Sequence, residues 1–285
     1  DSVSNSFASV LETNDNGFLI CGTTESPNDS TYNLLLLKTD SFGNIIWSKT
    51  IGGTGDYSGI RVIKDGTNDF VVIARSSFNG GILIMKIDFM GNTIWSKTYS
   101  GQNVYPTNIC KTNDNGFIIA GTKITFGNNY DKDGYLFKLN SVGDSLWFKL
   151  YVDTIFGESF GCVQQTNDSG FVITGTTGEF NGGQSDCLVL KADDSGNIIW
   201  KRSYNFDNGN SDGGSYIQAT NDSGYIVIGT TGYNRVFMLK LDGSGLLLGE
   251  NPIIFLTNNV FQIYPNPFST QTILQTDNLF HNATL

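Results

Sequence analysis

Acidic side chains are the residues of this sequence that are easiest to relate to a reaction. Two carboxylates that face each other across a cleft can cleave a glycosidic bond as general acid and general base. No spacing along the chain selects one pair. The candidates, all in connections that vary between repeated segments, are Asp29, Asp56, Asp131, Asp133, Asp153, Glu158, Glu179, Asp186, Asp207 and Asp212. A polysaccharide-active hydrolase or lyase is therefore the alternative function that the sequence leaves open.

Aromatic side chains occupy the same variable connections and could contact a ligand. Binding residues concentrate on loops that a rigid scaffold carries, and an aromatic ring can pack against a protein or a sugar. The candidates for ligand contact are Tyr57, Tyr105, Phe126, Tyr130, Phe156, Phe180, Phe206 and Tyr233. The competing interpretation is that these rings only pack their own loops. The sequence favours a non-catalytic domain that binds a protein or a glycan partner.

The composition argues against several other functions. The 285 residues carry a net charge of −10, and nucleic acid requires a clustered positive surface. The single histidine, His281, sits near the C-terminus, which argues against a histidine general base and against a multi-histidine metal site. No apolar run is long enough to span a membrane. We assign no cofactor, no metal and no catalytic residue from the sequence.

Two acidic patterns resemble metal-binding loops only in part. The segment 131–134 (DKDG) begins like an EF-hand loop, but Tyr135 and Val142 stand where further acids are needed, so a solvated loop is expected. A second pattern, Thr-Asn-Asp-x-Gly, is too short to wrap around an ion. Its acids are Asp15, Asp114, Asp168 and Asp222. These segments are predicted to be tight turns, with the glycine in the left-handed conformation.

The strands that must position these acidic and aromatic residues belong to a sequence repeat of about 50 residues. A short motif that contains every tryptophan recurs four times, at Trp47, Trp95, Trp147 and Trp200, which lie about 50 residues apart. Short apolar runs ending in a lysine recur five times, at Lys38, Lys86, Lys138, Lys191 and Lys240. Each lysine is expected to pair locally with the Asp or Asn two residues later.

Each repeat contains four strand-like runs and no helical periodicity, which predicts the blade of a β-propeller. In the first repeat the strands are expected at about 7–12, 17–24, 33–39 and 44–50. The predicted fold is all-β. It has five four-stranded repeats, as a five-bladed ring or as part of a larger propeller, and a partial C-terminal β-sandwich segment. The repeats span about 7–51, 58–99, 106–151, 159–204 and 214–249 of a propeller at 1–250, followed by a linker at 251–258.

The sequence also predicts an atypical last strand in the propeller and cysteines that form no disulfide within a blade. In the fifth repeat the fourth run, 245–248, lacks a tryptophan and is degenerate, as terminal repeats often are. Cys21, Cys110 and Cys162 are expected to be small buried hydrophobic residues. Cys162 and Cys187 fall on the first and third strands of one blade, which lie too far apart for a disulfide.

The tryptophan motif resembles the tryptophan-docking repeat of quinoprotein propellers. In both, a glycine precedes the tryptophan at a fixed spacing, as Gly43 precedes Trp47, although the Asp40-to-Gly43 spacing is one residue shorter here. The resemblance implies a blade style rather than a chemistry. It assigns the four tryptophans to structural docking between neighbouring blades.

Residues 259–285 resemble the beginning of another family. The segment NVFQIYPNPFSTQTILQT, with Tyr264, Pro265, Asn266, Pro267 and Phe268 at its centre, is similar to the start of the type A C-terminal sorting domain of Bacteroidetes type IX secretion cargo. We therefore expect a truncated sorting domain in this segment. The resemblance implies the type IX secretion machinery as a partner, and a secreted or outer-cell-surface location.

Overall fold

The computed structural model describes ten stretches of the chain, together with the backbone of three short strands near the C-terminus. The stretches are 5–26, 31–52, 56–76, 80–100, 103–125, 131–152, 156–179, 185–206, 211–232 and 235–249. Within them, the side chains of Asp131, Phe156 and Glu179 lie outside the described part.

Antiparallel sheets follow one another along the chain, each built from consecutive strands. The first sheet comprises β1 (Asn5–Glu12), β2 (Phe18–Glu25), β3 (Tyr32–Thr39) and β4 (Ile45–Ile51). The second comprises β5 (Tyr57–Lys64), β6 (Phe70–Ser76), β7 (Gly81–Ile87) and β8 (Thr93–Tyr99). The third comprises β9 (Val104–Lys111), β10 (Phe117–Thr125), β11 (Asp131–Leu139) and β12 (Ser145–Tyr151). The fourth comprises β13 (Phe156–Gln165), β14 (Phe171–Glu179), β15 (Ser185–Ala192) and β16 (Ile198–Tyr204).

The fifth sheet differs from the others at its outer edge. Its first three strands are β17 (Asp212–Ala219), β18 (Tyr225–Thr231) and β19 (Arg235–Leu241). The degenerate run 245–248 contributes only an isolated bridge between Leu241 and Leu247. The short strand β20 (Ile253–Leu256) pairs with β19 in its place, so part of the expected linker at 251–258 belongs to the sheet.

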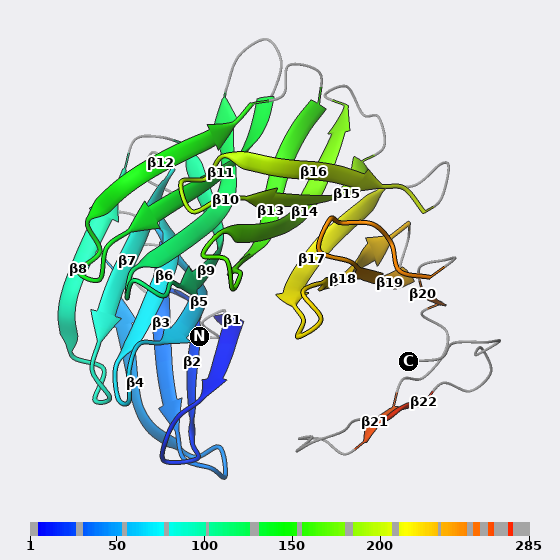
Figure 1. Ribbon diagram of the computed structural model, residues 1–285. Helices are drawn as coiled ribbons and strands as arrows, with labels where there is room; N and C mark the ends of the chain where they lie inside the picture. Colours follow the sequence, from blue (N-terminus) through cyan, green and yellow to red (C-terminus); the bar gives the residue numbers. More distant parts are fainter. Residues whose placement is uncertain are drawn as a thin grey trace.

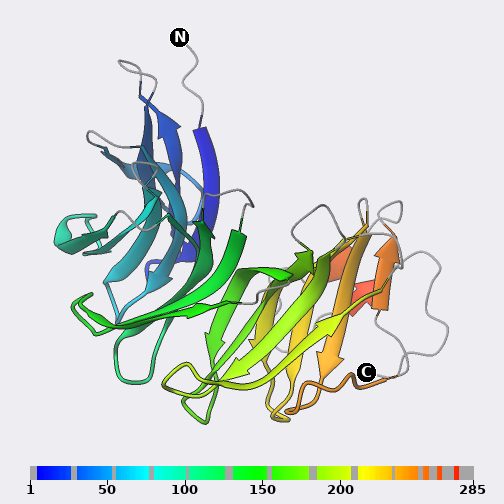
Figure 2. The same ribbon diagram turned by 90° about the horizontal axis from the view of Figure 1, so that it is seen from above.

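The sheets are the blades of a β-propeller, as the repeats predict. Figure 1 shows them as an arc, with the first strand of each blade on the inner side and the fourth on the outer rim. Figure 2 shows the same blades in sequence from above, from the N-terminal to the C-terminal end of the chain. Consecutive blades pack face to face, so the middle strands are covered on both faces. β6 and β7 are buried along most of their length, whereas β8 alternates between exposed and half-buried residues. The expected partial sandwich at 259–285 lies outside the described residues, apart from a pairing of β21 (Gln262–Tyr264) with β22 (Ile273–Gln275).

All five inner strands carry the same irregularity. Register shifts mark β1 between Phe7 and Ser9, and β5 between Gly59 and Arg61, and the same feature recurs in β9, β13 and β17. A bulge increases strand twist, which suits a strand that must turn toward the centre of the arc. Across that centre, the Arg61 guanidinium carbon lies 6.0 Å from the ring centre of Tyr216 on β17.

The Thr-Asn-Asp-x-Gly turns form where expected, but their glycine is not the left-handed residue. The preceding residue is, as at Asn16 (φ 60°) and Ser169 (φ 67°). The glycine is required for a different reason. A Cβ at Gly17 would lie 2.1 Å from the carbonyl oxygen of Thr39 on the neighbouring strand. In the turn before the fourth strand the glycine does take the left-handed conformation, as at Gly43 (φ 85°) and Gly91 (φ 73°).

The repeated lysines do not pair with the residue two positions later. Lys38 is buried, and its ammonium donates to both carboxylate oxygens of Asp15, at 3.1 and 2.8 Å. The same pairing joins lysine and turn aspartate in the third, fourth and fifth blades. In the second blade, Lys86 pairs with Asp65 and Asp69 instead. The local prediction was wrong because the hairpin brings the earlier turn over the end of the third strand.

The four cysteines are free thiols. Cys21, Cys162 and Cys187 are buried, whereas Cys110 is only half-buried, which corrects its expected full burial. Burial raises the pKa of the Cys21 and Cys187 thiols to about 12. No helix in the described part of the chain is long and apolar enough to cross a membrane.

Candidate functional site

The junction between consecutive blades is built by one face of the fourth strand. Side chains alternate along a strand, so the tryptophan and the residues two and four positions later all point to the same side. In β8 these are Trp95, Lys97 and Tyr99. Lys97 donates to Asp144 of the next blade at 2.7 Å, and the Tyr99 hydroxyl donates to the carbonyl of Gly143 at 2.5 Å.

The indole contacts the next blade through tilted or edge-to-face ring contacts and through a hydrogen bond. The Trp95 ring centre lies 6.3 Å from that of Phe117, and Trp147 and Phe171 are 6.2 Å apart. The indole N–H of Trp47 donates to the carbonyl of Phe89 at 3.3 Å. The structure therefore places these tryptophans between blades rather than toward the variable connections.

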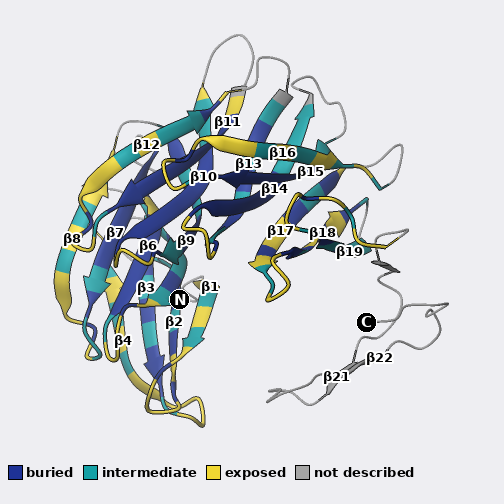
Figure 3. Cartoon of the chain, in the orientation of Figure 1, coloured by how far each residue is buried: buried dark blue, intermediate teal, exposed yellow. Residues whose placement is uncertain are grey.

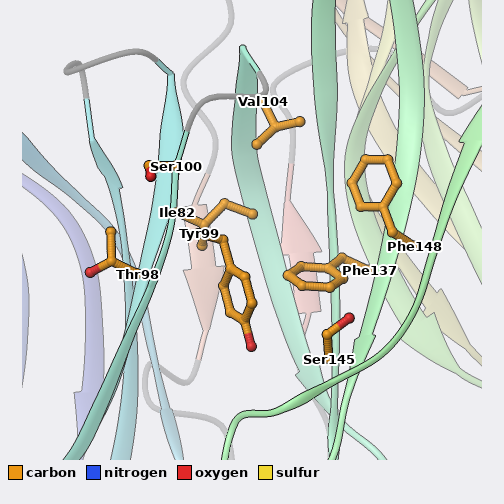
Figure 4. Close-up of a pocket in the computed structure, with 8 residues that line it drawn as sticks. All are labelled: Ile82, Thr98, Tyr99, Ser100, Val104, Phe137, Ser145 and Phe148. Atoms are coloured by element: carbon orange, nitrogen blue, oxygen red, sulfur yellow. The ribbon is translucent and has the colours of Figure 1, made fainter.

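A groove of about 450 Å³ opens at the junction of the second and third blades. It lies within the size range of small-molecule sites, which are typically about 300–1,000 Å³ and mostly apolar. Figure 4 shows that Tyr99, Phe137 and Phe148 come from different strands, with the Phe137 ring between the other two and Ser145 beside Phe137. The lining residues are Ile82, Thr98, Tyr99, Ser100, Val104, Phe137, Ser145 and Phe148.

Phe148 distinguishes this junction from the others. It pairs with Phe137 on β11, and its ring stacks on Tyr135 with 5.2 Å between centres and 23° between planes. Phe148 nevertheless remains 40% exposed. The equivalent position in the other complete blades holds Ser48, Ser96 or Lys201. Phe148 is thus an exposed aromatic surface on a rigid strand, supported by two further rings.

Tyr99 and Phe137 form the rest of the aromatic surface. Their ring centres are 4.8 Å apart at an interplanar angle of 87°, an edge-to-face arrangement that fixes both rings. Burial raises the pKa of the Tyr99 phenol, so this hydroxyl remains protonated and acts as a hydrogen-bond group. The described lining contains no charged side chain.

A second groove, of about 380 Å³, lies at the junction of the third and fourth blades and has a different chemistry. Glu158 is buried there and forms an ion pair with Lys201. Lys201 holds the position on β16 of the fourth blade that Phe148 holds on β12 of the third. Tyr151 donates its hydroxyl to the carbonyl of Gly196 at 2.7 Å, and burial raises the pKa of the phenol. Glu158 is the one carboxylate among the described residues that line this groove.

The aromatic residues expected to contact a ligand are dispersed. Tyr57 packs into the core between the first two blades, and Phe206 lies 4.5 Å from Phe237 between ring centres. The guanidinium carbon of Arg75 lies 4.2 Å from the Tyr105 ring centre. Four candidates, Phe126, Tyr130, Phe180 and Tyr233, lie outside the described residues, as does the side chain of Phe156.

The acidic candidates are mostly engaged in holding the fold. Asp56 accepts the Tyr32 N–H at 2.8 Å, and Asp212 accepts the Phe206 N–H at 2.8 Å. Asp186 accepts a hydrogen bond from the Asn205 amide at 2.8 Å. Asp133 is buried within strand β11, so the segment expected to be a solvated loop belongs to a strand. Asp29, Asp153 and Asp207 lie outside the described residues, as do the side chains of Asp131 and Glu179.

Metal binding has no visible site in the described part of the chain. No three side chains of the His, Cys, Asp and Glu types come together there as ligands. In four of the turns considered above as calcium loops, the lysine ammonium already takes the place beside the carboxylate.

The groove was not predicted from the sequence, although one feature of the repeats pointed to it. Phe148 replaces the serine that follows tryptophan in the first two repeats, and this break in the pattern was visible. A tyrosine also stands four residues after three of the four tryptophans, and Ile51 takes this position after Trp47. The hydroxyls of these tyrosines, Tyr99, Tyr151 and Tyr204, each donate to a carbonyl of the next blade.

The comparisons with known proteins support the fold. No protein-family model matches the chain, and no curated protein sequence matches it significantly. Solved structures do. A protein of unknown function from Bacteroides caccae is 10% identical with a TM-score of 0.54, covering 88% of this chain and 82% of that one. An ulvan lyase of polysaccharide lyase family 25 is 11% identical with a TM-score of 0.62, covering 89% and 71%.

A third similar structure is a variant of the Synechocystis apocarotenoid oxygenase. It is 12% identical with a TM-score of 0.50, covering 89% of this chain and 66% of that one. At these identities the likeness shows a shared β-propeller fold and says nothing about activity.

Proposed function

We propose that this chain is a non-catalytic β-propeller that binds a glycan in the groove between its second and third blades. The observation that carries the proposal is the exposed ring of Phe148, held on a rigid strand by Tyr135 and Phe137. A sugar ring presents C–H groups on its faces and hydroxyls on its edge. An aromatic surface bordered by Ser100 and Ser145 offers a complement to both.

The uncharged lining favours a neutral sugar. A binding site for an acidic polysaccharide would need a cation near the sugar carboxylate or sulfate, and the described lining of this groove supplies none. The rings are already ordered by contacts within the protein, so little side-chain entropy is lost on binding.

A glycan array followed by calorimetric titration tests the proposal. Phe148→Ala should weaken binding of a neutral oligosaccharide by about fivefold or more, since one stacked ring contributes on the order of 1 kcal/mol or more. Ile94→Ala is the matched control, because Ile94 is exposed on β8 and does not line the groove. Equal loss in both variants, or no neutral glycan bound by the parent protein, would contradict the proposal.

A polysaccharide-active enzyme is the second candidate, and the charged groove between the third and fourth blades favours it. Glu158 could serve as a catalytic carboxylate there, with Lys149 and Lys201 close to an acidic substrate. The ulvan lyase named above has the same fold. Reducing-end and ultraviolet assays on uronic-acid polysaccharides test this, and activity that Glu158→Gln abolishes would replace the binding proposal.

We also propose that the protein is exported by the type IX machinery to the medium or the outer cell surface. The support is the segment around Tyr264–Phe268 and its place directly after a repeat domain. Protease treatment of intact producer cells, with immunodetection of the propeller, tests the location. Protein that is neither in the medium nor cleaved on intact cells would contradict export.

A further inference from the structure

The first blade carries an unfilled copy of the socket that receives tryptophan at each later blade. The filled copies show what the socket consists of. One part is the aromatic residue that begins the second strand. Phe117, Phe171 and Tyr225 each lie about 6 Å from the tryptophan of the preceding blade between ring centres, and all are buried. The matching residue of the first blade is Phe18, which is 37% exposed.

The glycine before the fourth strand is the second part of the socket. At Gly91, Gly143, Gly196 and Gly245, an added Cβ would lie within about 3 Å of the indole of the preceding blade. At Gly43, which has the same left-handed conformation, an added Cβ would meet nothing within 4 Å. The surface that four indoles cover elsewhere is therefore open on the first blade.

Polar partners complete the socket. Asn92 donates its amide to Asp88, and its carbonyl oxygen accepts the ammonium of Lys49 at 3.0 Å. Asn44 of the first blade donates to Asp40 at 2.8 Å in the same way. Its side-chain carbonyl oxygen is thereby oriented like that of Asn92. It could accept a hydrogen bond from a lysine or arginine that stands two residues after a docked tryptophan, as Lys49 stands after Trp47.

Apolar surface surrounds this empty socket. Phe7 and Val10 on β1 are 60% and 62% exposed, unlike the largely buried strands in the middle of the arc. Figure 3 shows this contrast, with β1 largely exposed at one end of the arc while β6, β7, β10 and β14 are buried.

The sequence determines what could fill the socket. The chain contains four tryptophans, and all four already occupy junctions between its own blades. A second folded copy therefore has none to offer, and the outer strand of its fifth blade, β20, reads IIFL. We infer that the first blade is a docking site for a further propeller blade whose outer strand carries a tryptophan and, two residues later, a lysine or arginine.

Adding such a blade to the full chain tests the inference. A copy of residues 103–152, which contains Trp147 and Lys149, is joined ahead of residue 1. Phe18→Ala is then compared in two backgrounds, the fusion as designed and the fusion in which the added tryptophan is replaced (W147A in the copy). We expect Phe18→Ala to lower Tm by about 2–4 °C more when the added tryptophan is present. Equal losses in the two backgrounds would overturn the inference.

A titration of the unaltered chain covers the case in which the fusion does not fold. The peptide SGNIIWKRSY (residues 195–204) is compared with the same peptide carrying W200A, and the protein is followed by NMR. We expect shifts at Phe18, Gly43 and Asn44 with the tryptophan peptide only. Equal effects of both peptides, or none at millimolar concentration, would overturn the inference. So would sedimentation data that show a dimer of the chain which Phe18→Ser dissociates.

Discussion

Gly143 of the third blade lies against the indole of Trp95 of the second blade, so closely that an added Cβ would be 2.7 Å from a ring carbon. Gly43 occupies the same position in the first blade without an indole beside it. The two glycines share a left-handed backbone, with φ of 80° and 85°. They differ in their surroundings, because only Gly143 has side chains of a preceding blade beside it, the Trp95 indole and, at 3.3 Å from the added Cβ, Lys97.

Alanine at the two positions should therefore separate backbone strain from blade packing. Gly43→Ala should cost about 1–2 kcal/mol, the strain of an L-residue in the left-handed region. Gly143→Ala adds displacement of Trp95 and should cost about 2–4 kcal/mol. Urea unfolding of the two variants measures the difference. Equal costs would mean that the indole yields freely and contributes little to the junction.

The buried lysine of each blade depends on the turn aspartate. Lys138 is almost fully buried and donates to Asp114 at 3.0 and 2.7 Å. Asp114→Ala leaves this ammonium without its charged partner and should destabilise by about 2–3 kcal/mol. Lys138→Met leaves only a half-exposed carboxylate, which water can solvate, and should cost less.

The control for this prediction is an ion pair between blades at the surface. Lys97 and Asp144 are 40% and 53% exposed, so Asp144→Ala should change the free energy of unfolding by less than about 1 kcal/mol. A loss at Asp144 as large as that at Asp114 would show that burial of the lysine is not what makes the turn pair matter.

The same pairs should make the protein sensitive to acid. Desolvation alone would raise the pKa of Asp114, but hydrogen bonds from Lys138, Thr112 and Gly116 lower it to about 2. The pKa of Asp15 is lowered to about 2 in the same way. An unfolded aspartate titrates near pH 3.9, so these groups stabilise the fold above about pH 4 and stop doing so as pH falls toward 2.

Urea midpoints measured between pH 2 and pH 7 check this dependence. The variant with both Asp15→Asn and Asp114→Asn should be less stable than the parent at pH 7, and the two should converge toward pH 2. A constant difference across this range would mean that the two carboxylates keep the same pKa in the folded and unfolded chain.

The features of the fold that depend on periodicity could be predicted from the sequence. The four tryptophans and five lysines marked each blade, and the expected strands of the first repeat agree with β1–β4 to within about two residues. Contacts that join residues distant in sequence could not be predicted in this way. The partner of Lys138 lies 24 residues earlier, and the stacking of Phe148 on Tyr135 depends on the pairing of β11 with β12. Neither follows from local spacing.

Thiol reactivity should report burial directly. Burial raises the pKa of Cys21 and Cys187 to about 12, so both remain protonated and inaccessible at pH 8. Cys110 is half-buried and should react first with an aromatic disulfide reagent. Cys110→Ser should remove the fast phase and leave labelling that proceeds at the rate of unfolding. A second fast phase in this variant would mean that another thiol is exposed by local opening.

The two final residues of the Thr-Asn-Asp-Ser-Gly turn of the fourth blade are constrained for different reasons. Ser169 has φ of 67° and bears the conformational strain, whereas Gly170 faces the carbonyl of Ala192, 2.4 Å from where a Cβ would stand. Ser169→Gly removes the strain but adds freedom to the unfolded chain, so it should change stability by less than about 1 kcal/mol.

Gly170→Ala has no such compensation. The carbonyl it meets belongs to the backbone of β15 and cannot move without disturbing the Lys191–Asp168 pair. We expect a loss of about 2–4 kcal/mol, measured by urea unfolding beside Ser169→Gly. If Ser169→Gly proved the more damaging change, the turn would depend on the serine side chain rather than on the space that glycine leaves beside β15.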